Sequence, residues 1–349
     1  MDPYQELTLY QRSAVLMAAA KLGLFLAMGE GATRPSELAG RLGAPTDTVS
    51  RLLVALRSLD YLSGEGDQFR LNDFSRAFVR AGAGGMVRLA WKEHLFYTAW
   101  SGLADVIASG KAVFPTFRDR LANDFSSVEK FLLALNDLAE AGAPGVIETG
   151  AFRGARTILD LGGGAGGYAG ELARALPDAR VTLADLGEVI PIAEGHLERK
   201  GLRDRVELVA ADFLEDGCGL PGTSFDCVFL SHVLHDFDGS TASAIVRQAA
   251  GLVRGGGKLV VLDVLVPDEG PGNPVEALFD LMMLVEVPQG RTHRIADVRR
   301  WIELTGMASP QWHKLYFGSL LESRAVTRRR LESEGPLPGR TGGTGLTFR

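Results

Sequence analysis

Cysteines, positive charge and long apolar runs are all scarce in this chain of 349 residues. Its two cysteines, Cys218 and Cys227, indicate neither a disulfide framework nor a zinc site, so a reducing cytosol is the expected location. The net charge of -6 provides no chain-wide attraction for nucleic acid or anionic lipid. The N-terminus lacks the basic stretch of a signal peptide, and the apolar run 14–28 is too short and too amphipathic to span a bilayer. The composition is typical of a globular protein with two domains.

The first hundred residues are predicted to form amphipathic helices followed by a small β-wing. Residues 35–44 and 46–59 have the pattern of a helix, a glycine-containing turn and a second helix, and residues 61–71 that of a wing. Together they resemble a winged helix, which raises the possibility of DNA binding. The second helix has only Arg51 and Arg57 as cations among many apolar residues, so a core or dimer-interface helix is favoured. A ligand-responsive DNA-binding regulator remains the alternative, and salt-dependent binding to duplex DNA would test it.

Residues 86–145 are also predicted to be helical, and the beginning of this segment is rich in aromatic side chains. Two interpretations are equally open: a core stripe at helical spacing, or the wall of a pocket for a flat substrate. The residues concerned are Trp91, His94, Phe96, Tyr97 and Trp100.

From residue 157 onward, short apolar strands alternate with helices. This alternation predicts a doubly wound, mostly parallel α/β sheet that binds its ligand at the carboxyl ends of the strands. The predicted strands are 157–161, 180–184, 206–210, 225–230 and 258–264.

A glycine-rich turn follows the first of these strands. Gly162, Gly164 and Gly167 permit tight turning and close approach of the backbone to a ligand, but they match the dinucleotide fingerprint as well as other nucleotide sites. Asp160 favours S-adenosylmethionine over a nicotinamide dinucleotide, because a carboxylate there would repel a pyrophosphate and attract the ammonium and sulfonium groups.

The next two strands also end in acidic residues. Asp185 ends the second strand, where a carboxylate can accept hydrogen bonds from both ribose hydroxyls. Asp212 and Phe213 follow the third strand and offer an acceptor for the adenine amine and a ring to pack on the base. Three acids at three strand ends predict a methyltransferase-like cofactor site.

The fourth strand leads into Ser-His-Val-Leu-His-Asp-Phe at residues 231–237. With this motif the chain resembles the caffeic acid and hydroxyneurosporene type of small-molecule O-methyltransferases, from the N-terminal winged helix to Gly306. The resemblance implies a Rossmann-like S-adenosylmethionine-dependent methyltransferase domain, which releases S-adenosylhomocysteine, preceded by a mostly helical dimerisation domain. It also implies a homodimer and a small hydroxylated, aromatic acceptor.

The resemblance assigns the role of general base to His235. A phenol with a pKa of about 10 is a poor nucleophile until it is deprotonated, and a histidine with a pKa of about 6.5 can accept the proton. Of the two family acids that orient this histidine, the first falls at Asp263 and the second at Gly290, which has no carboxylate.

Further roles carried over from the family concern the cofactor and the acceptor. Cofactor contacts are expected at Asp160, Gly162, Gly164, Asp185, Asp212, Phe213 and Ser231. Of these, Asp160 and Gly164 are added from the glycine turn, and Ser231 replaces a lysine of many plant members. Acceptor contacts are expected at Phe131, Leu135, His232, Asp280, Met282, Met283 and Val287, with ordinary helix core as the equal alternative for the methionines.

The sequence therefore predicts a cytosolic, metal-independent O-methyltransferase with domains at 1–105 and 106–332 and a tail at 333–349. No binding to nucleic acid or membrane is expected. The alternative with the same fold methylates carbon or nitrogen, or uses bound S-adenosylmethionine for decarboxylation, hydroxylation or rearrangement.

Overall fold

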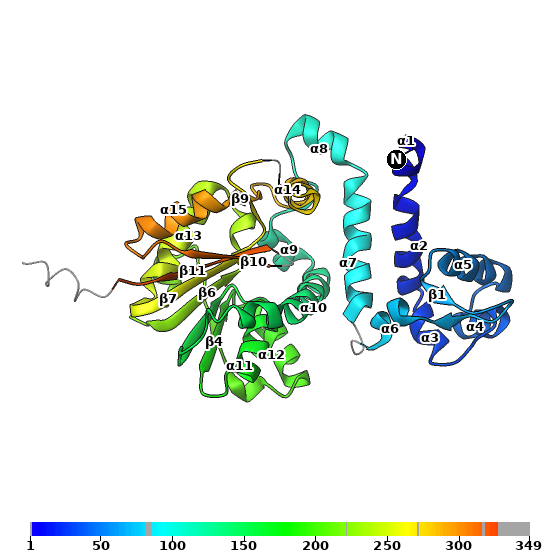
Figure 1. Cartoon of the computed structure of the whole chain (residues 1–349), viewed down its shortest axis with the longest axis horizontal. Helices are drawn as coiled ribbons and strands as arrows, with labels where there is room; N and C mark the ends of the chain where they lie inside the picture. The colour runs from blue at the N-terminus through cyan, green and yellow to red at the C-terminus, as the bar shows by residue number, and fades with distance from the viewer. Residues whose placement is uncertain (1, 81–84, 221, 271, 316–317, 327–349) are drawn as a thin grey trace, which may run out of the picture.

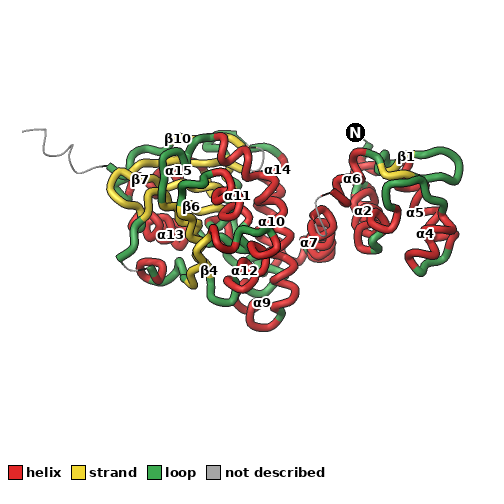
Figure 2. Tube along the Cα trace, turned by 90° about the horizontal axis from the view of Figure 1, so that it is seen from below, coloured by secondary structure: helices red, strands yellow, loops and turns green. Residues whose placement is uncertain are grey.

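The computed structural model describes residues 2–80, 85–220, 222–270, 272–315 and 318–326. The predicted tail at 333–349 lies outside these residues. An N-terminal module and a larger α/β domain stand at opposite ends of the molecule, with a long helix between them (Figure 2). Within the described residues, no helix combines the length and apolar character needed to cross a membrane.

The N-terminal module consists of helices and one two-stranded wing. Helix α5 buries Val49, Leu53 and Leu56, which share one face, while an exposed ion pair joins Asp47 to Arg51. The core-facing interpretation of this helix is therefore confirmed. The elements are α1 (Pro3–Thr8), α2 (Tyr10–Lys21), α3 (Leu24–Met28), α4 (Pro35–Leu42), α5 (Thr46–Ser58), β1 (Leu62–Ser63), β2 (Arg70–Leu71) and α6 (Asp73–Arg80).

Four helices connect the module to the sheet: α7 (Gly85–Trp100), α8 (Leu103–Ser109), α9 (Phe117–Asn123) and α10 (Phe125–Glu148). Helix α7 packs between α2 of the module and α10 of the α/β domain (Figure 1). Arg88 of α7 donates to Asp137 of α10 through Nε at 2.8 Å, which fixes one long helix to the other.

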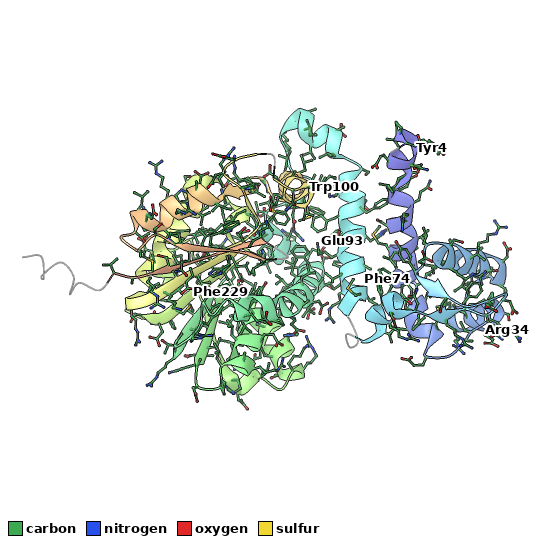
Figure 3. All side chains as sticks on the ribbon, viewed as in Figure 1. Tyr4, Arg34, Phe74, Glu93, Trp100 and Phe229 are labelled. Carbon is green, nitrogen blue, oxygen red and sulfur yellow. The ribbon has the colours of Figure 1, made fainter. Side chains whose placement is uncertain are left out.

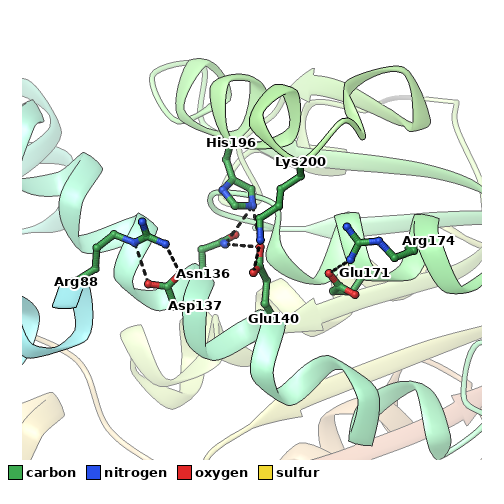
Figure 4. Close-up of polar contacts among 8 residues, drawn as sticks. All are labelled: Arg88, Asn136, Asp137, Glu140, Glu171, Arg174, His196 and Lys200. Carbon is green, nitrogen blue, oxygen red and sulfur yellow. Dashed lines mark hydrogen bonds and ion pairs between the residues drawn. The ribbon is translucent and has the colours of Figure 1, made fainter. Parts of the chain in front are cut away.

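Helix α10 is in turn fixed to the α/β domain by a partly buried polar cluster (Figure 4). Glu140 accepts from Lys200 Nζ at 2.7 Å and lies 2.9 Å from the ring Nε2 of His196. His196 is on α12 (Ile190–Arg199), and Lys200 directly follows that helix. These contacts lower the pKa of Glu140 to about 2, although burial alone would raise it. The cluster keeps α10, which carries Phe131, at a fixed position beside the sheet.

A seven-stranded sheet forms the centre of the α/β domain, in the order β10-β11-β7-β6-β3-β4-β5. Its first five strands in the chain are parallel, so their carboxyl ends lie at one edge, which confirms the doubly wound prediction. The antiparallel pair formed by β10 and β11 was not part of the sequence prediction. The strands are β3 (Thr157–Leu161), β4 (Arg180–Asp185), β5 (Val206–Ala210), β6 (Phe225–Ser231), β7 (Val253–Asp263), β10 (Gln311–Leu315) and β11 (Gly318–Arg324).

Helices cover both faces of this sheet, and alternate strand residues face the two layers. On β3, Leu159 and Leu161 pack with α13 and α15, whereas Ile158 packs with α10, α11 and α12. This division explains why the strands are apolar along their whole length. The remaining elements are α11 (Gly167–Ala175), η1 (Arg203–Arg205), η2 (Asp216–Gly219), η3 (Leu234–Asp236), α13 (Gly239–Gly251), β8 (Leu265–Val266), α14 (Pro274–Glu286), β9 (His293–Arg294) and α15 (Ile295–Leu304).

Candidate active site

The glycine turn after β3 is held in a conformation that excludes side chains. Gly162 has φ +77°, and a Cβ atom there would lie 2.8 Å from the Val233 side chain and 3.3 Å from Phe213. The amide of Gly164 donates to Asp185 Oδ2 at 2.7 Å, which attaches the turn to the end of β4. The glycine turn and Asp185 at the end of β4 are thus brought together, and the backbone of the turn can lie close to a bound ligand.

Asp160 is the clearest sign that this end of the sheet binds a cation. The residue is fully buried, and neither carboxylate oxygen has a hydrogen-bond partner of normal geometry among the described residues. Burial, together with the charge of Asp185, raises the pKa of Asp160 to about 7. A buried carboxyl group without a partner fits the ammonium group of S-adenosylmethionine, which would supply the missing donors.

Asp185 is only partly satisfied by the protein. Its oxygens accept from the amides of Gly164 and Leu186, both at 2.7 Å, and the residue is buried. Burial raises its pKa to about 6, while these two amide bonds act in the opposite direction. A carboxylate accepts up to about four hydrogen bonds, so capacity remains for two ribose hydroxyls.

The third predicted acid, Asp212, has a partner that sequence reasoning missed. Arg118 of α9 forms an ion pair with Asp212, and the amide of Leu214 donates to the same carboxylate at 2.9 Å. Phe213 packs edge-on against Phe237, with ring centroids 5.8 Å apart. Arg118 of α9 therefore occupies part of the carboxylate that was predicted to bind the adenine.

His235 and Asp263 form a tightly bonded pair at the neighbouring strand ends. Nδ1 of His235 lies 2.6 Å from Oδ1 of Asp263, and the other oxygen accepts from the amides of Leu234 and His235 at 3.0 and 3.3 Å. Burial alone would lower the pKa of His235, but the charge and hydrogen bond of Asp263 raise it to about 9. The predicted positioning of His235 by Asp263 is present in the structure, and Nε2 on the other side of the ring lies 3.7 Å from Asp236 Oδ1.

His232 lies beside this pair in a backbone conformation that is rare for residues other than glycine. Its φ is +54°, and its ring stacks near Tyr168 with centroids 6.4 Å apart. Burial lowers its pKa to about 4, so the ring is neutral at physiological pH. Potential ligand atoms of His232, His235 and Asp263 lie within 4.8 Å of one another. Because Asp263 already accepts hydrogen bonds on both oxygens, the arrangement is better explained as a proton-transfer site than as a metal site.

The predicted acceptor residues differ in where they lie. Phe131 is buried and contacts Phe96 with ring centroids 6.2 Å apart, and Met283 is buried on α14. Leu135 is 37% exposed, and Met282 and Val287 are partly buried. Asp280 is exposed and accepts from the amide and hydroxyl of Thr292, both at 2.7 Å, so its visible role is to hold the loop after α14.

Two aromatic residues of α7 make contacts that favour the core interpretation left open by the sequence. Phe96 is buried and packs with Phe114 as well as Phe131. Tyr97 is 39% exposed and stacks with Tyr10 of the N-terminal module. Packing between helices explains these contacts.

Three side chains near His235 were not identified from the sequence. Phe279 packs edge-on against the imidazole at 5.0 Å, and Arg120 lies over Phe131 with its guanidinium 4.9 Å from the ring centroid. Glu286, at the end of α14, is buried and lies 3.6 Å from Arg120. These residues come from α9 and α14, and helical spacing alone could not distinguish them from core or surface positions.

The fold and these side chains define a methyltransferase of the S-adenosylmethionine-dependent class, with a carboxylate at each nucleotide-binding strand end and a buried His–Asp pair beside them. Residues 100–308 match the O-methyltransferase domain, and residues 5–81 match the O-methyltransferase dimerisation domain. The chain belongs to this O-methyltransferase family, and S-adenosylmethionine is its cofactor.

Relatives and solved structures agree with this assignment. The chain is 30% identical over 311 residues to 3-amino-4-hydroxybenzoate 4-O-methyltransferase of Streptomyces cremeus, covering 85% of this chain and 82% of the relative. It is 29% identical over 303 residues to 3-hydroxy-5-methyl-1-naphthoate 3-O-methyltransferase of Streptomyces sahachiroi, covering 84% and 86%. Human N-acetylserotonin methyltransferase, solved in complex with S-adenosylmethionine, shares the fold with a TM-score of 0.83 at 22% identity, covering 93% of this chain and 96% of that chain.

Proposed function

We propose that this O-methyltransferase methylates a hydroxyl group on a small aromatic acceptor of one or two rings, with His235 as general base. The observation that carries the proposal is the buried 2.6 Å contact between His235 and Asp263, with the ring of Phe279 packed edge-on against the imidazole. The two Streptomyces relatives are named for hydroxylated benzoate and naphthoate acceptors, which agrees with an aromatic pocket of this kind.

Residues at the strand ends would hold the cofactor. Asp160 would accept from its ammonium group, Asp185 from its ribose, and the amides of the glycine turn would line the remaining backbone. When bound, S-adenosylmethionine supplies an activated methyl group. Asp212 would reach the adenine only if it shares its carboxylate with Arg118 or releases that ion pair.

His235 would then remove the proton of the acceptor hydroxyl. Asp263 fixes the ring through Nδ1, so Nε2 is the nitrogen that accepts the proton. A pKa of about 9 makes the neutral ring a strong base, but it also leaves most of the imidazole protonated at pH 7 in the ligand-free protein. Activity is therefore expected to rise with pH through the range in which His235 loses its proton.

Isotopically labelled S-adenosylmethionine tests the reaction directly. We expect labelled products that are one methyl group heavier from a panel of hydroxylated benzoates, naphthoates and neutral phenols, with S-adenosylhomocysteine released in equal amount. Methylation on nitrogen or carbon, or cofactor turnover without a methylated product, would contradict the proposal. Activity that survives EDTA treatment would support metal-independent catalysis; loss that added metal restores would overturn it.

A homodimer through the N-terminal module is part of the same proposal, supported by the match to the dimerisation domain. Helix α1 buries none of its residues in the described chain: Leu7 is 76% exposed, and Tyr4, which is labelled in Figure 3, is 72% exposed. An isolated six-residue helix is unstable in water, so packing against a second copy would account for it. Light scattering of the full chain should give twice the monomer mass, and Leu7→Asp should reduce it; a monomeric wild type would disprove the dimer.

The proposed domain boundaries are 1–105 and 106–332, which the two family matches support without fixing their limits. The two buried cysteines, both unpaired, support the proposed cytosolic location.

A further inference from the structure

His293 is a buried histidine that the proposed cofactor and acceptor contacts do not include. It lies on β9 and is 4% exposed, and its Nε2 is 3.0 Å from the carbonyl oxygen of Leu234. A carbonyl oxygen can only accept, so the proton of the neutral ring must be on Nε2. Burial lowers the pKa of His293, which keeps the ring neutral at physiological pH. His293 is therefore a fixed donor to the residue that precedes His235 in the chain.

The carbonyl of Leu234 does not need this donor in order to be satisfied. It already accepts from the amide of Phe237 at 3.1 Å within the short turn η3. The His293 ring meets Trp301 edge-on, with ring centroids 5.0 Å apart, and an apolar side chain on β9 could make such a contact without burying a polar nitrogen. The bond from His293 therefore connects β9 to the turn instead of supplying a missing partner for the carbonyl.

The backbone of the turn that carries His235 is bonded from two sides. Asp263 Oδ2 accepts from the amides of Leu234 and His235 at 3.0 and 3.3 Å. The amide of Arg291 donates to the His235 carbonyl at 2.8 Å, and His293 donates to the Leu234 carbonyl. All four backbone polar groups of these two residues thus have partners, with Asp263 holding the amides and the segment 291–293 holding the carbonyls.

The segment 290–293 is shaped for this close approach. A Cβ atom at Gly290 would lie 3.2 Å from the His235 carbonyl oxygen, so glycine lets the segment pack tightly on the turn. The amide and the hydroxyl of Thr292 both donate to Asp280 at 2.7 Å, which fixes the segment to α14. Since these anchors do not involve the ring of His293, the segment should keep its fold when His293 is replaced.

We propose that His293 is a positioning residue for the methyl transfer described above: by holding the Leu234 carbonyl, it fixes the turn so that the imidazole of His235 stays aligned with Asp263. The inference rests on the proposed function. The proton of the acceptor hydroxyl goes to Nε2 of His235, and His293 neither gains nor loses a proton during the reaction. Because a displacement of about 1 Å can reduce a rate by about a hundredfold, a donor outside the reacting groups can still control kcat.

The experiment compares wild type with His293→Leu, His293→Gln and Ile302→Ala. His293→Leu removes the donor and keeps an apolar side chain, whereas the longer amide introduced by His293→Gln can reach the same carbonyl. Ile302→Ala is the matched control: Ile302 is fully buried on α15, which directly follows β9, and belongs to the same core cluster as Leu234. Its truncation leaves a cavity and lowers stability without removing a bond to the turn.

Rates are measured well below the melting temperature of every variant, with the panel acceptor that wild type methylates fastest. We expect His293→Leu to lower kcat roughly tenfold while KM for the acceptor and Kd for S-adenosylmethionine change by less than about twofold, because the position of the base alone is affected. His293→Gln should recover most of the rate, and Ile302→Ala should keep it.

Proton NMR of the ligand-free full chain provides a measurement that needs no acceptor. The Nδ1 proton of His235 lies in the 2.6 Å contact with Asp263, and a proton in so short a charged hydrogen bond resonates far downfield. This resonance should shift in His293→Leu and keep its wild-type position in His293→Gln and Ile302→Ala.

Each outcome supports or overturns the role of His293. A wild-type kcat or an unshifted resonance in His293→Leu overturns it, as does an equal loss of rate in Ile302→Ala or a rate that His293→Gln does not recover. If His293→Leu fails to fold, His293→Asn, whose amide is one methylene shorter than that of glutamine, replaces it in the same comparison. A shifted resonance in a protein that methylates no hydroxyl group would refute the proposed function and leave the positioning of His235 by His293 in place.

Discussion

The cofactor half and the acceptor half of this site are built in different ways. Asp160, Asp185 and the glycine turn stand at the ends of adjacent parallel strands, so backbone pairing alone brings them together. On the acceptor side, Phe131, Glu286 and His235 come from α10, α14 and the turn after β6, and only helix packing joins them. The arrangement of the cofactor half follows from strand pairing in the sheet, whereas the arrangement of the acceptor half follows from how the helices pack on the sheet.

This difference has consequences for substitution. Changes in the cofactor half should each remove a contact to a different chemical group of the cofactor, although the charge of Asp185 also raises the pKa of Asp160. Changes in the acceptor half should act through shared charges, since Asp263, Asp236 and Glu286 all influence the same imidazole. The following experiments test this contrast, from the largest expected effect to the smallest.

Asp185→Ala should have the largest effect and should confine it to cofactor binding. Loss of two charged hydrogen bonds to the ribose is expected to weaken S-adenosylmethionine binding by roughly 100- to 1000-fold, measured by calorimetry. The pKa of His235 should not change. Wild-type affinity in the variant, or tight NADH binding by the wild type, would show that the carboxyl ends of the strands bind a different ligand.

His235→Ala should give the complementary result in the acceptor half. We expect kcat to fall roughly a hundredfold while S-adenosylmethionine affinity remains nearly unchanged, because the general base is lost and the strand ends are intact. Turnover at the wild-type rate across the pH range would mean that the enzyme works by proximity alone or performs different chemistry.

The pH dependence of the rate sharpens the comparison further. Because Asp263 raises the pKa of His235 to about 9, kcat should increase as the pH rises from 7 to 9, by about tenfold per pH unit well below the pKa. Asp263→Asn removes the anion, so the midpoint should move to lower pH and the rate at the plateau should fall. If the midpoint of the pH–rate profile does not move in this variant, deprotonation of His235 does not control the rate.

Asp160→Asn should reveal a conflict between stability and binding. Since the folded-state pKa of about 7 lies above the ordinary value of 3.8, ionisation of this buried acid destabilises the ligand-free protein as the pH rises above about 4 and through 7. At pH 8 the variant should melt roughly 2 °C higher than wild type and bind S-adenosylmethionine about tenfold more weakly. A variant that binds normally would assign the ammonium group to another acceptor.

Ser231→Ala should give the smallest effect. The serine ends β6 and is nearly buried, but it has no charge to offer, so affinity for the cofactor is expected to change by less than about threefold. If Ser231→Ala weakens cofactor binding as much as Asp185→Ala does, the binding energy is distributed over the residues at the strand ends more evenly than their individual contacts suggest.

Sequence reasoning predicted the parallel strands well and the packing of the helices only in part. Four of the five parallel strands were predicted to within one residue, because their apolar runs reflect burial on both faces, whereas β7 begins at Val253 instead of residue 258. It did not predict β10 and β11, nor the ion pair of Arg118 with Asp212, which joins residues 94 positions apart in the chain. Asp280 was expected at the acceptor, yet its contacts hold Thr292.

The sequence by itself determined the parallel sheet and the glycine turn, since both depend on residue type and on spacing along neighbouring strands. The pairing of His235 with Asp263 was implied by the resemblance to the O-methyltransferase family. Only the tertiary structure decided which helix side chains reach that histidine. Helical periodicity defines a face but not what the face meets, so Glu286 and Arg120 were indistinguishable from surface charges until α9 and α14 packed together. The residues of the cofactor site are brought together by the order of neighbouring strands, and those of the acceptor site by the packing of helices.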